Sequence, residues 1–114
     1  MKKKPDESRL DLLQGTLDMM VLRTLLAGPA NGYEIAKAIE RESDGVLEVD
    51  HGSLYPALHR LERSGKVAGR WEVSSTNRKA RYYRLTPAGK KQLLLEQSRW
   101  ETMAAAIARV MRPA

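Results

Sequence analysis

Apolar residues recur at helical spacing in the first third of the chain. They fall on one face of a helix: Leu17, Met20, Val21 and Leu25. Thr16 is a suitable N-cap and Gly28-Pro29 is a stop signal, so a first, central helix is predicted between them. Residues 1–14 are then expected to form a charged arm ahead of this helix.

A second helix is predicted to follow at once. Asn31 and Glu34 have the spacing of a capping box, in which each side chain bonds the other residue's backbone N–H. The helix should run towards Ser43 and end at Asp44-Gly45. Residues 46–50 are expected to form a short extended link.

The third helix is predicted from Leu54, Leu58 and Leu61, which share one face at i, i+4 and i+7. Gly65 ends it by adopting the left-handed conformation of a C′ position. Either Asp50 or Ser53 can cap its start. Asp50 is favoured because Gly52 and Ser53 then lie on the first turn, although this places a proline just past the turn that tolerates it.

Residues 66–73 and 81–85 alternate as two strands of a hairpin, joined by the polar and basic segment 74–80. The side chains expected to face inward are Val67, Trp71, Val73, Tyr83 and Leu85. A flexible basic loop between two strands is typical of the wing of a winged helix-turn-helix.

A long helix is predicted from Thr86-Pro87, an N-cap followed by proline at N1, to Pro113. It would hold roughly 26 residues over about 39 Å. Apolar residues recur every seven positions along one side of this helix, at Leu93, Trp100 and Ile107. Two further apolar residues, Met103 and Val110, flank this seam. So small a domain cannot cover this seam, so a second copy of the chain is expected to bury it.

These elements predict a mainly α protein with a small β-hairpin. Residues 1–86 would form the arm and a winged helix-turn-helix, and residues 87–114 a dimerisation helix.

The charge distribution points to a polyanionic partner. The chain of 114 residues carries a net charge of +6. Residues 60–91 hold ten basic and two acidic groups, a balance of +8, against −2 for the other 82 residues. Such a patch binds nucleic acid by releasing counterions. The alternative is a solvated basic face, or one that binds an acidic protein.

Other classes of function lack the residues they need. The chain has no Cys, and His51 and His59 have no third clustered histidine, so no metal site is predicted. No nucleophile, base and orienter fall into a triad pattern, so neither enzymatic activity nor a cofactor is expected. No apolar run approaches the ~20 residues of a membrane span. No apolar signal core follows the basic start, so a cytoplasmic location is expected.

Four motifs resemble the PadR-type transcriptional regulators, in the same order as in that family. They are Gly15-Thr16-Leu17-Asp18, Asn31-Gly32-Tyr33-Glu34-Ile35, residues 52–62 (GSLYPALHRLE) and residues 81–89 (RYYRLTPAG). The similarity covers roughly residues 12–95. It implies a dimeric bacterial repressor with a winged helix-turn-helix, in the compact branch with one helix after the wing. Several relatives respond to phenolic acids or other aromatic compounds.

The resemblance also implies roles for individual residues. The groove-facing side of the third helix would carry Ser53, Tyr55, Pro56, His59 and Arg60. Arg78 and Lys79 match the wing tip, and Tyr33 matches a position near the phosphate backbone. Trp100 matches an aromatic position near a ligand cavity in some relatives.

Structural roles remain open for several of these residues. Ser53 and Tyr55 could cap or pack, and Trp100 could be simple core of a helix seam. Arg60 is favoured over Arg63 for DNA contact because Arg63 adjoins the helix end.

The function predicted is that of a homodimeric repressor of transcription. It would bind a palindromic operator in double-stranded DNA with half-sites about one turn apart, and an aromatic small molecule or other signal would release it. The alternative is a winged-helix module that binds an acidic protein partner.

Overall fold

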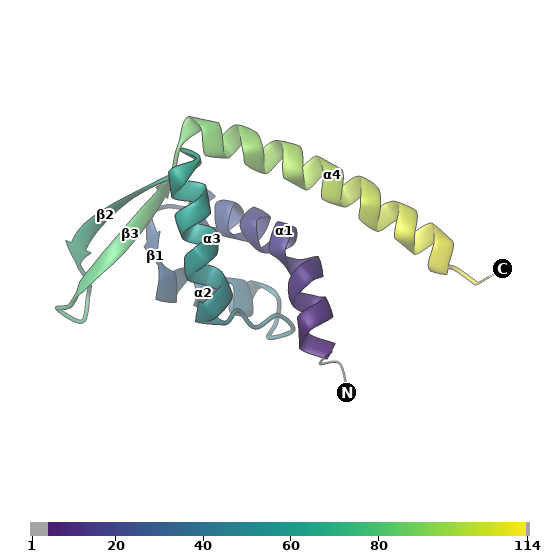
Figure 1. The fold of residues 1–114 in the computed structure, drawn as a ribbon, viewed down its shortest axis with the longest axis horizontal. Helices are drawn as coiled ribbons and strands as arrows, with labels where there is room; N and C mark the ends of the chain where they lie inside the picture. The colour runs from purple at the N-terminus through teal and green to yellow at the C-terminus, as the bar shows by residue number, and fades with distance from the viewer. Residues whose placement is uncertain (1–4, 114) are drawn as a thin grey trace.

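The computed structural model describes residues 5–113 of the chain, with side chains from Gly15 onward. In that range it has four helices and three strands: α1 (Pro5–Leu26), β1 (Ala30–Asn31), α2 (Gly32–Glu42), α3 (His51–Arg63), β2 (Val67–Val73), β3 (Lys79–Leu85) and α4 (Pro87–Met111). The first three helices pack together, the β2–β3 hairpin projects from one side of them, and α4 crosses α1 and extends beyond it (Figure 1). This is the predicted winged helix-turn-helix followed by one long helix.

Helix α1 begins much earlier than predicted. It starts at Pro5, so Thr16 lies inside the helix instead of capping it, and residues 5–14 are helical. The rest of the predicted arm, residues 1–4, lies outside the described residues. Extending a helix by one residue costs little once the rest of the helix is stable. The helix can therefore continue past Thr16 towards the N-terminus, although Thr16 is a suitable N-cap. The predicted end is confirmed, because the helix stops at Leu26 and Gly28 has φ +146°.

The sheet has one strand more than the hairpin that was predicted. The strand order is β1-β3-β2, and both pairs are antiparallel. In β1, Ala30 pairs with Tyr83 and Asn31 with Tyr82. Asn31 is also the N-cap of α2, so this two-residue strand fixes the start of α2 against the centre of the sheet.

One core joins all the long elements. Its completely or nearly completely buried residues include Val21 and Leu22 from α1, Ile35 from α2, Leu54 and Leu58 from α3, Val67 from β2, Tyr83 from β3 and Leu93 from α4. Two of the residues expected to face inward from the hairpin do not reach this core. Trp71 is 59% exposed and Val73 is 65% exposed, because the hairpin projects past the helices that could cover them.

The junction between α3 and β2 holds the start of α4. The Thr86 hydroxyl accepts a hydrogen bond from the Gly89 N–H at 3.0 Å, as an N-cap does. The same hydroxyl lies 2.6 Å from the carbonyl oxygen of Gly65 and 2.9 Å from that of Lys66. A Cβ at Gly89 would lie 2.0 Å from the Lys66 carbonyl oxygen, so only glycine allows this approach. The direction in which α4 leaves the domain is therefore fixed next to the end of α3.

Candidate nucleic-acid interface

Helix α3 has the earlier of the two predicted starts. Asp50 is the N-cap, and its Oδ1 accepts a hydrogen bond from the Ser53 N–H at 2.9 Å. The Ser53 hydroxyl donates to the other carboxylate oxygen at 3.3 Å, so Ser53 takes part in the cap while lying on the first turn. Pro56 lies inside the helix and cannot donate the usual N–H to the carbonyl of Gly52.

The exposed side of α3 is a single stripe on the face opposite its buried leucines. After the exposed first residue, His51, it consists of Gly52, Tyr55, Pro56, His59 and Arg63, at i, i+3, i+4, i+7 and i+11. Three of the residues predicted to contact DNA therefore lie on one surface. Arg63 was not among the residues predicted to contact DNA, yet it is the last helical residue and continues this stripe. Its spacing of four from His59 was the signal that identifies it. We call these five residues the α3 stripe.

Tyr55 both packs and remains accessible. A Cβ at Gly32 would lie 2.7 Å from the Tyr55 hydroxyl oxygen, so the phenol ring rests against the first turn of α2. Its ring meets that of His51 edge to face, with centroids 5.6 Å apart. The side chain is still 39% exposed. Packing against α2 thus leaves part of the Tyr55 side chain accessible, so it does not exclude the predicted DNA contact.

The start of α2 adds a second exposed group beside α3. The capping box is present, with the Asn31 side chain bonded to the Glu34 N–H at 2.8 Å and Glu34 bonded back to the Asn31 N–H at 3.0 Å. This cap presents Tyr33 to solvent, and Lys37 lies over its ring at 5.6 Å from the centroid. An ammonium group and a phenol hydroxyl at this position suit a phosphate.

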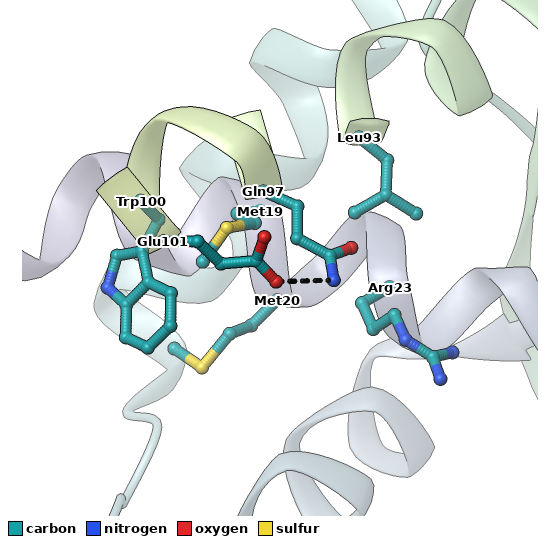
Figure 2. Close-up of a pocket in the computed structure, with 7 residues that line it drawn as sticks. All are labelled: Met19, Met20, Arg23, Leu93, Gln97, Trp100 and Glu101. Atoms are coloured by element: carbon teal, nitrogen blue, oxygen red, sulfur yellow. Dashed lines mark hydrogen bonds between the residues drawn. The ribbon is translucent and has the colours of Figure 1, made fainter. Parts of the chain in front are cut away.

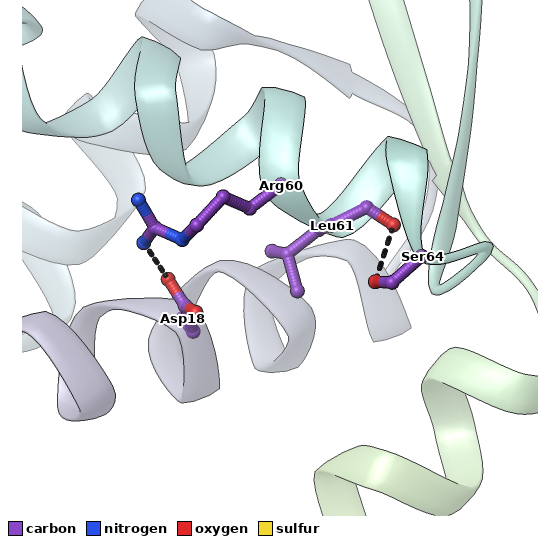
Figure 3. Close-up of polar contacts among 4 residues, drawn as sticks. All are labelled: Asp18, Arg60, Leu61 and Ser64. Atoms are coloured by element: carbon purple, nitrogen blue, oxygen red, sulfur yellow. Dashed lines mark hydrogen bonds and ion pairs between the residues drawn. The ribbon is translucent and has the colours of Figure 1, made fainter.

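Arg60 is oriented differently from the α3 stripe. Its Nη2 donates to Oδ1 of Asp18 on α1 at 2.9 Å, as Figure 3 shows. Burial raises the pKa of the Asp18 carboxyl above its usual value of 3.8, although the charge and hydrogen bond of Arg60 lower it. Arg60 therefore has a partner within the chain, whereas Arg63 ends the helix exposed.

The loop at the end of the hairpin is short and tight. The carbonyl of Ser74 accepts from the Asn77 N–H at 2.9 Å, and Asn77 has φ +61°. The carbonyl of Arg78 accepts from the Ser74 N–H at 2.7 Å. Strand β3 begins at Lys79, two residues earlier than predicted, so Lys79 lies on the strand opposite Val73. Both basic side chains predicted for the wing tip are exposed.

The residues expected at a dimer interface divide into two groups along α4. Leu93 is only 2% exposed, because its own α1 covers it, so it belongs to the core of the single chain. The others are exposed: Trp100, Met103, Ile107 and Val110. They are spaced by three and four residues and form one apolar face, which we call the α4 seam.

A hollow of about 180 Å³ lies between α1 and α4 (Figure 2). Met19 and Met20 line it from α1, and Trp100 lines it from α4. At its polar side Gln97 donates to Glu101 at 3.3 Å. Trp100 thus borders both this hollow and the α4 seam.

The described elements define a winged helix-turn-helix protein with an exposed third-helix stripe beside a basic hairpin. The chain belongs to the PadR-like family of transcriptional regulators, whose sequence profile matches residues 21–94. Members of this family are regulators and not enzymes.

The chain is also similar to individual proteins. The chain is 32% identical to the "Uncharacterized protein X" of Lysinibacillus sphaericus over 85 residues, which are 75% of this chain and 78% of that protein. It is 29% identical to the negative transcriptional regulator PadR of Bacillus subtilis over 77 residues, 68% of this chain and 42% of that longer protein. The structure of a transcriptional regulator from Clostridium thermocellum is similar over 90% of this chain and 99% of that chain, with 30% identity and a TM-score of 0.81.

In the part of the chain that the structure describes, no three acidic or histidine side chains lie close enough together to hold a metal ion. No helix within it has the length and apolar character needed to cross a membrane.

Proposed function

We propose that this protein is a sequence-specific DNA-binding repressor that acts as a homodimer. The observation that carries the proposal is the α3 stripe, an exposed helical surface next to a basic hairpin in a member of a regulator family. A helix of this kind fits the major groove, where Arg63 and His59 meet base edges. Tyr33 and Lys37 on one side, and Arg78 and Lys79 on the other, bind the flanking phosphates.

The dimer is proposed from the α4 seam. Trp100, Met103, Ile107 and Val110 expose apolar surface along the outer half of a helix of 25 residues, and a second copy related by a two-fold axis buries it. Two α3 stripes related in this way contact two half-sites about one helical turn apart. The repressor role rests on the B. subtilis relative, which is a negative regulator. An aromatic effector that occupies the hollow beside Trp100 would release DNA by shifting α4.

The test is footprinting on DNA from upstream of the gene for this protein, with a random duplex of equal length as control. We expect a protected inverted repeat, with half-sites about 10 base pairs apart. His59→Ala and Arg63→Ala should each weaken binding to the protected sequence about tenfold and leave binding to the random duplex nearly unchanged, because base contacts are sequence-specific. Equal, weak binding to both duplexes would contradict the proposal. That result would favour the alternative in which the basic face binds an acidic protein.

A further inference from the structure

The hairpin carries an apolar surface that the fold does not use. Trp71 pairs with Arg81 and Val73 pairs with Lys79 across the two strands. Directly paired residues lie on the same face of a sheet, so these four share the face that buries Val67 further along. This face continues past the core, where the indole of Trp71 and the side chain of Val73 are more than half exposed.

This surface is turned towards α3. Arg81 Nη2 donates to Glu62 Oε2, and Glu62 lies in the last turn of α3. The Arg81 guanidinium also lies 5.8 Å from the centre of the Trp71 ring. Gly69 makes room for it, because a Cβ there would lie 2.9 Å from Arg81 Nε. Glu62, Arg81 and Trp71 thus connect the end of the α3 stripe to the hairpin.

The charges around the surface indicate what would cover it. Residues 67–85 carry five basic side chains and one acidic side chain, Glu72. Glu72 pairs with Ala80 and so lies on the opposite face, and Arg70 bonds it at 3.4 Å. The face of Trp71 and Val73 therefore combines apolar groups with the cation Lys79 and with Arg81, which is ion-paired with Glu62 of α3. A DNA strand offers the complement, because anionic phosphates alternate with apolar deoxyribose rings along it.

We propose that Trp71 and Val73 bind deoxyribose of the DNA strand beside the major groove, while Lys79 binds an adjacent phosphate. Arg81 is a positioning residue that keeps the indole facing α3. This inference rests on the proposed DNA binding. It assigns a role to the apolar face of the hairpin, in addition to the role of the basic residues at its tip. An apolar contact and a phosphate contact respond differently to salt, since only the latter releases counterions.

The first experiment uses the fact that the chain has two tryptophans. In a Trp100→Phe variant, Trp71 is the sole indole, so its fluorescence reports on the wing. Adding the duplex protected in footprinting should change the emission and lower acrylamide quenching at least twofold. Unchanged quenching with bound DNA would overturn the inference.

The second experiment measures affinity for the same duplex between 50 and 300 mM salt. Trp71→Ala should weaken binding roughly fivefold to tenfold at every salt concentration, as expected for some tens of Å² of lost apolar burial. Its plot of log affinity against log salt should keep the slope of the wild type. Lys79→Ala should lower that slope by about 1. Trp71→Phe should recover most of the affinity, and Leu94→Ala, an exposed apolar control on α4, should bind as the wild type does.

The two proposals fail in different ways. If the wild type binds no duplex specifically, the proposed function is wrong and this inference falls with it. If the wild type binds and Trp71→Ala, shown to be folded by its circular dichroism melting curve, binds equally well, this inference alone is wrong.

Discussion

The guanidinium of Arg60 on the third helix is bound to the carboxylate of Asp18 on the first, with 2.9 Å between Nη2 and Oδ1. The two residues are 42 positions apart. This pair ties the helix that carries the α3 stripe to the helix that lies under α4. Arg60 was predicted to contact DNA. For that contact its guanidinium must either release Asp18 or bind DNA while it keeps the hydrogen bond to Asp18.

Removing the carboxylate tests what the pair contributes to stability. Burial raises the pKa of Asp18 in the folded chain above 3.8. The folded chain then holds the Asp18 proton more tightly than the unfolded chain. The contribution of Asp18 to stability is therefore complete below pH 3.8 and is lost as the pH rises through the folded-state pKa. Asp18→Asn abolishes this titration, so the wild type should lose stability relative to the variant across that window.

The measurement is urea unfolding of both proteins from pH 3 to pH 7. At pH 7 we expect a difference within about 1 kcal/mol, because both side chains are partly exposed and solvent screens the attraction between them. A difference that does not change with pH would show that Asp18 titrates alike in both states. If Arg60 contacts DNA, Asp18→Asn should also strengthen operator binding, since the arginine is released.

The two basic residues at the wing tip should act through charge alone. Arg78→Ala combined with Lys79→Ala should weaken binding to all duplexes and reduce the salt slope by about 2, one for each phosphate contact. The matched control is Arg109→Ala with Arg112→Ala, which removes the same charge from the far end of α4. Equal effects of both double variants would mean that only net charge matters.

The α4 seam should determine oligomeric state. Ile107 is 55% exposed in the single chain, and Ile107→Asp places a charge where a partner helix is proposed. Sedimentation should show monomers for this variant and dimers for Leu94→Asp, whose exposed side chain lies on another side of the same helix. Dimers that persist in Ile107→Asp would exclude the seam as the interface.

The close approach at Gly89 should make that residue irreplaceable. Gly89→Ala forces a Cβ onto the Lys66 carbonyl, and a backbone atom cannot move as a side chain can. We expect a loss of about 2–3 kcal/mol in the free energy of unfolding. The control is Gly15→Ala in α1, where a Cβ meets nothing within 4 Å and alanine favours the helix. Similar melting temperatures for the two variants would contradict the packing described for this junction.

Local signals predicted the elements whose ends are set by caps. Asn31 with Glu34, Asp50, and Thr86 all cap helices as expected, because a cap depends on residues within one turn of itself. Strand β1 gave no such signal. It has two residues and forms only because β3 lies beside it, so no periodicity could predict it.

The site was predicted less completely than the fold, because exposure depends on what other elements cover. Trp71 has the alternation of an inward-facing strand residue, but the hairpin extends beyond the core, so the side chain is exposed. Leu93 has the spacing of the α4 seam, but α1 covers that part of α4. Arg60 and Arg63 both fall near the same helix end. The spacing of four residues from His59 marks Arg63, but the partner of Arg60 is Asp18, which lies 42 positions away and could not be predicted from local spacing.

Helix α4 has the geometry of a lever. Its pivot is the first turns, which Thr86, Gly89 and Leu93 hold to the domain, whereas Met103, Ile107 and Val110 on its outer half are exposed. Val110 lies 17 residues beyond Leu93, about 26 Å at 1.5 Å per residue. A tilt of about 5° at the pivot would carry the far end roughly 2 Å sideways over that length. In the proposed dimer, a tilt of this size would therefore alter the spacing between the two DNA-binding domains.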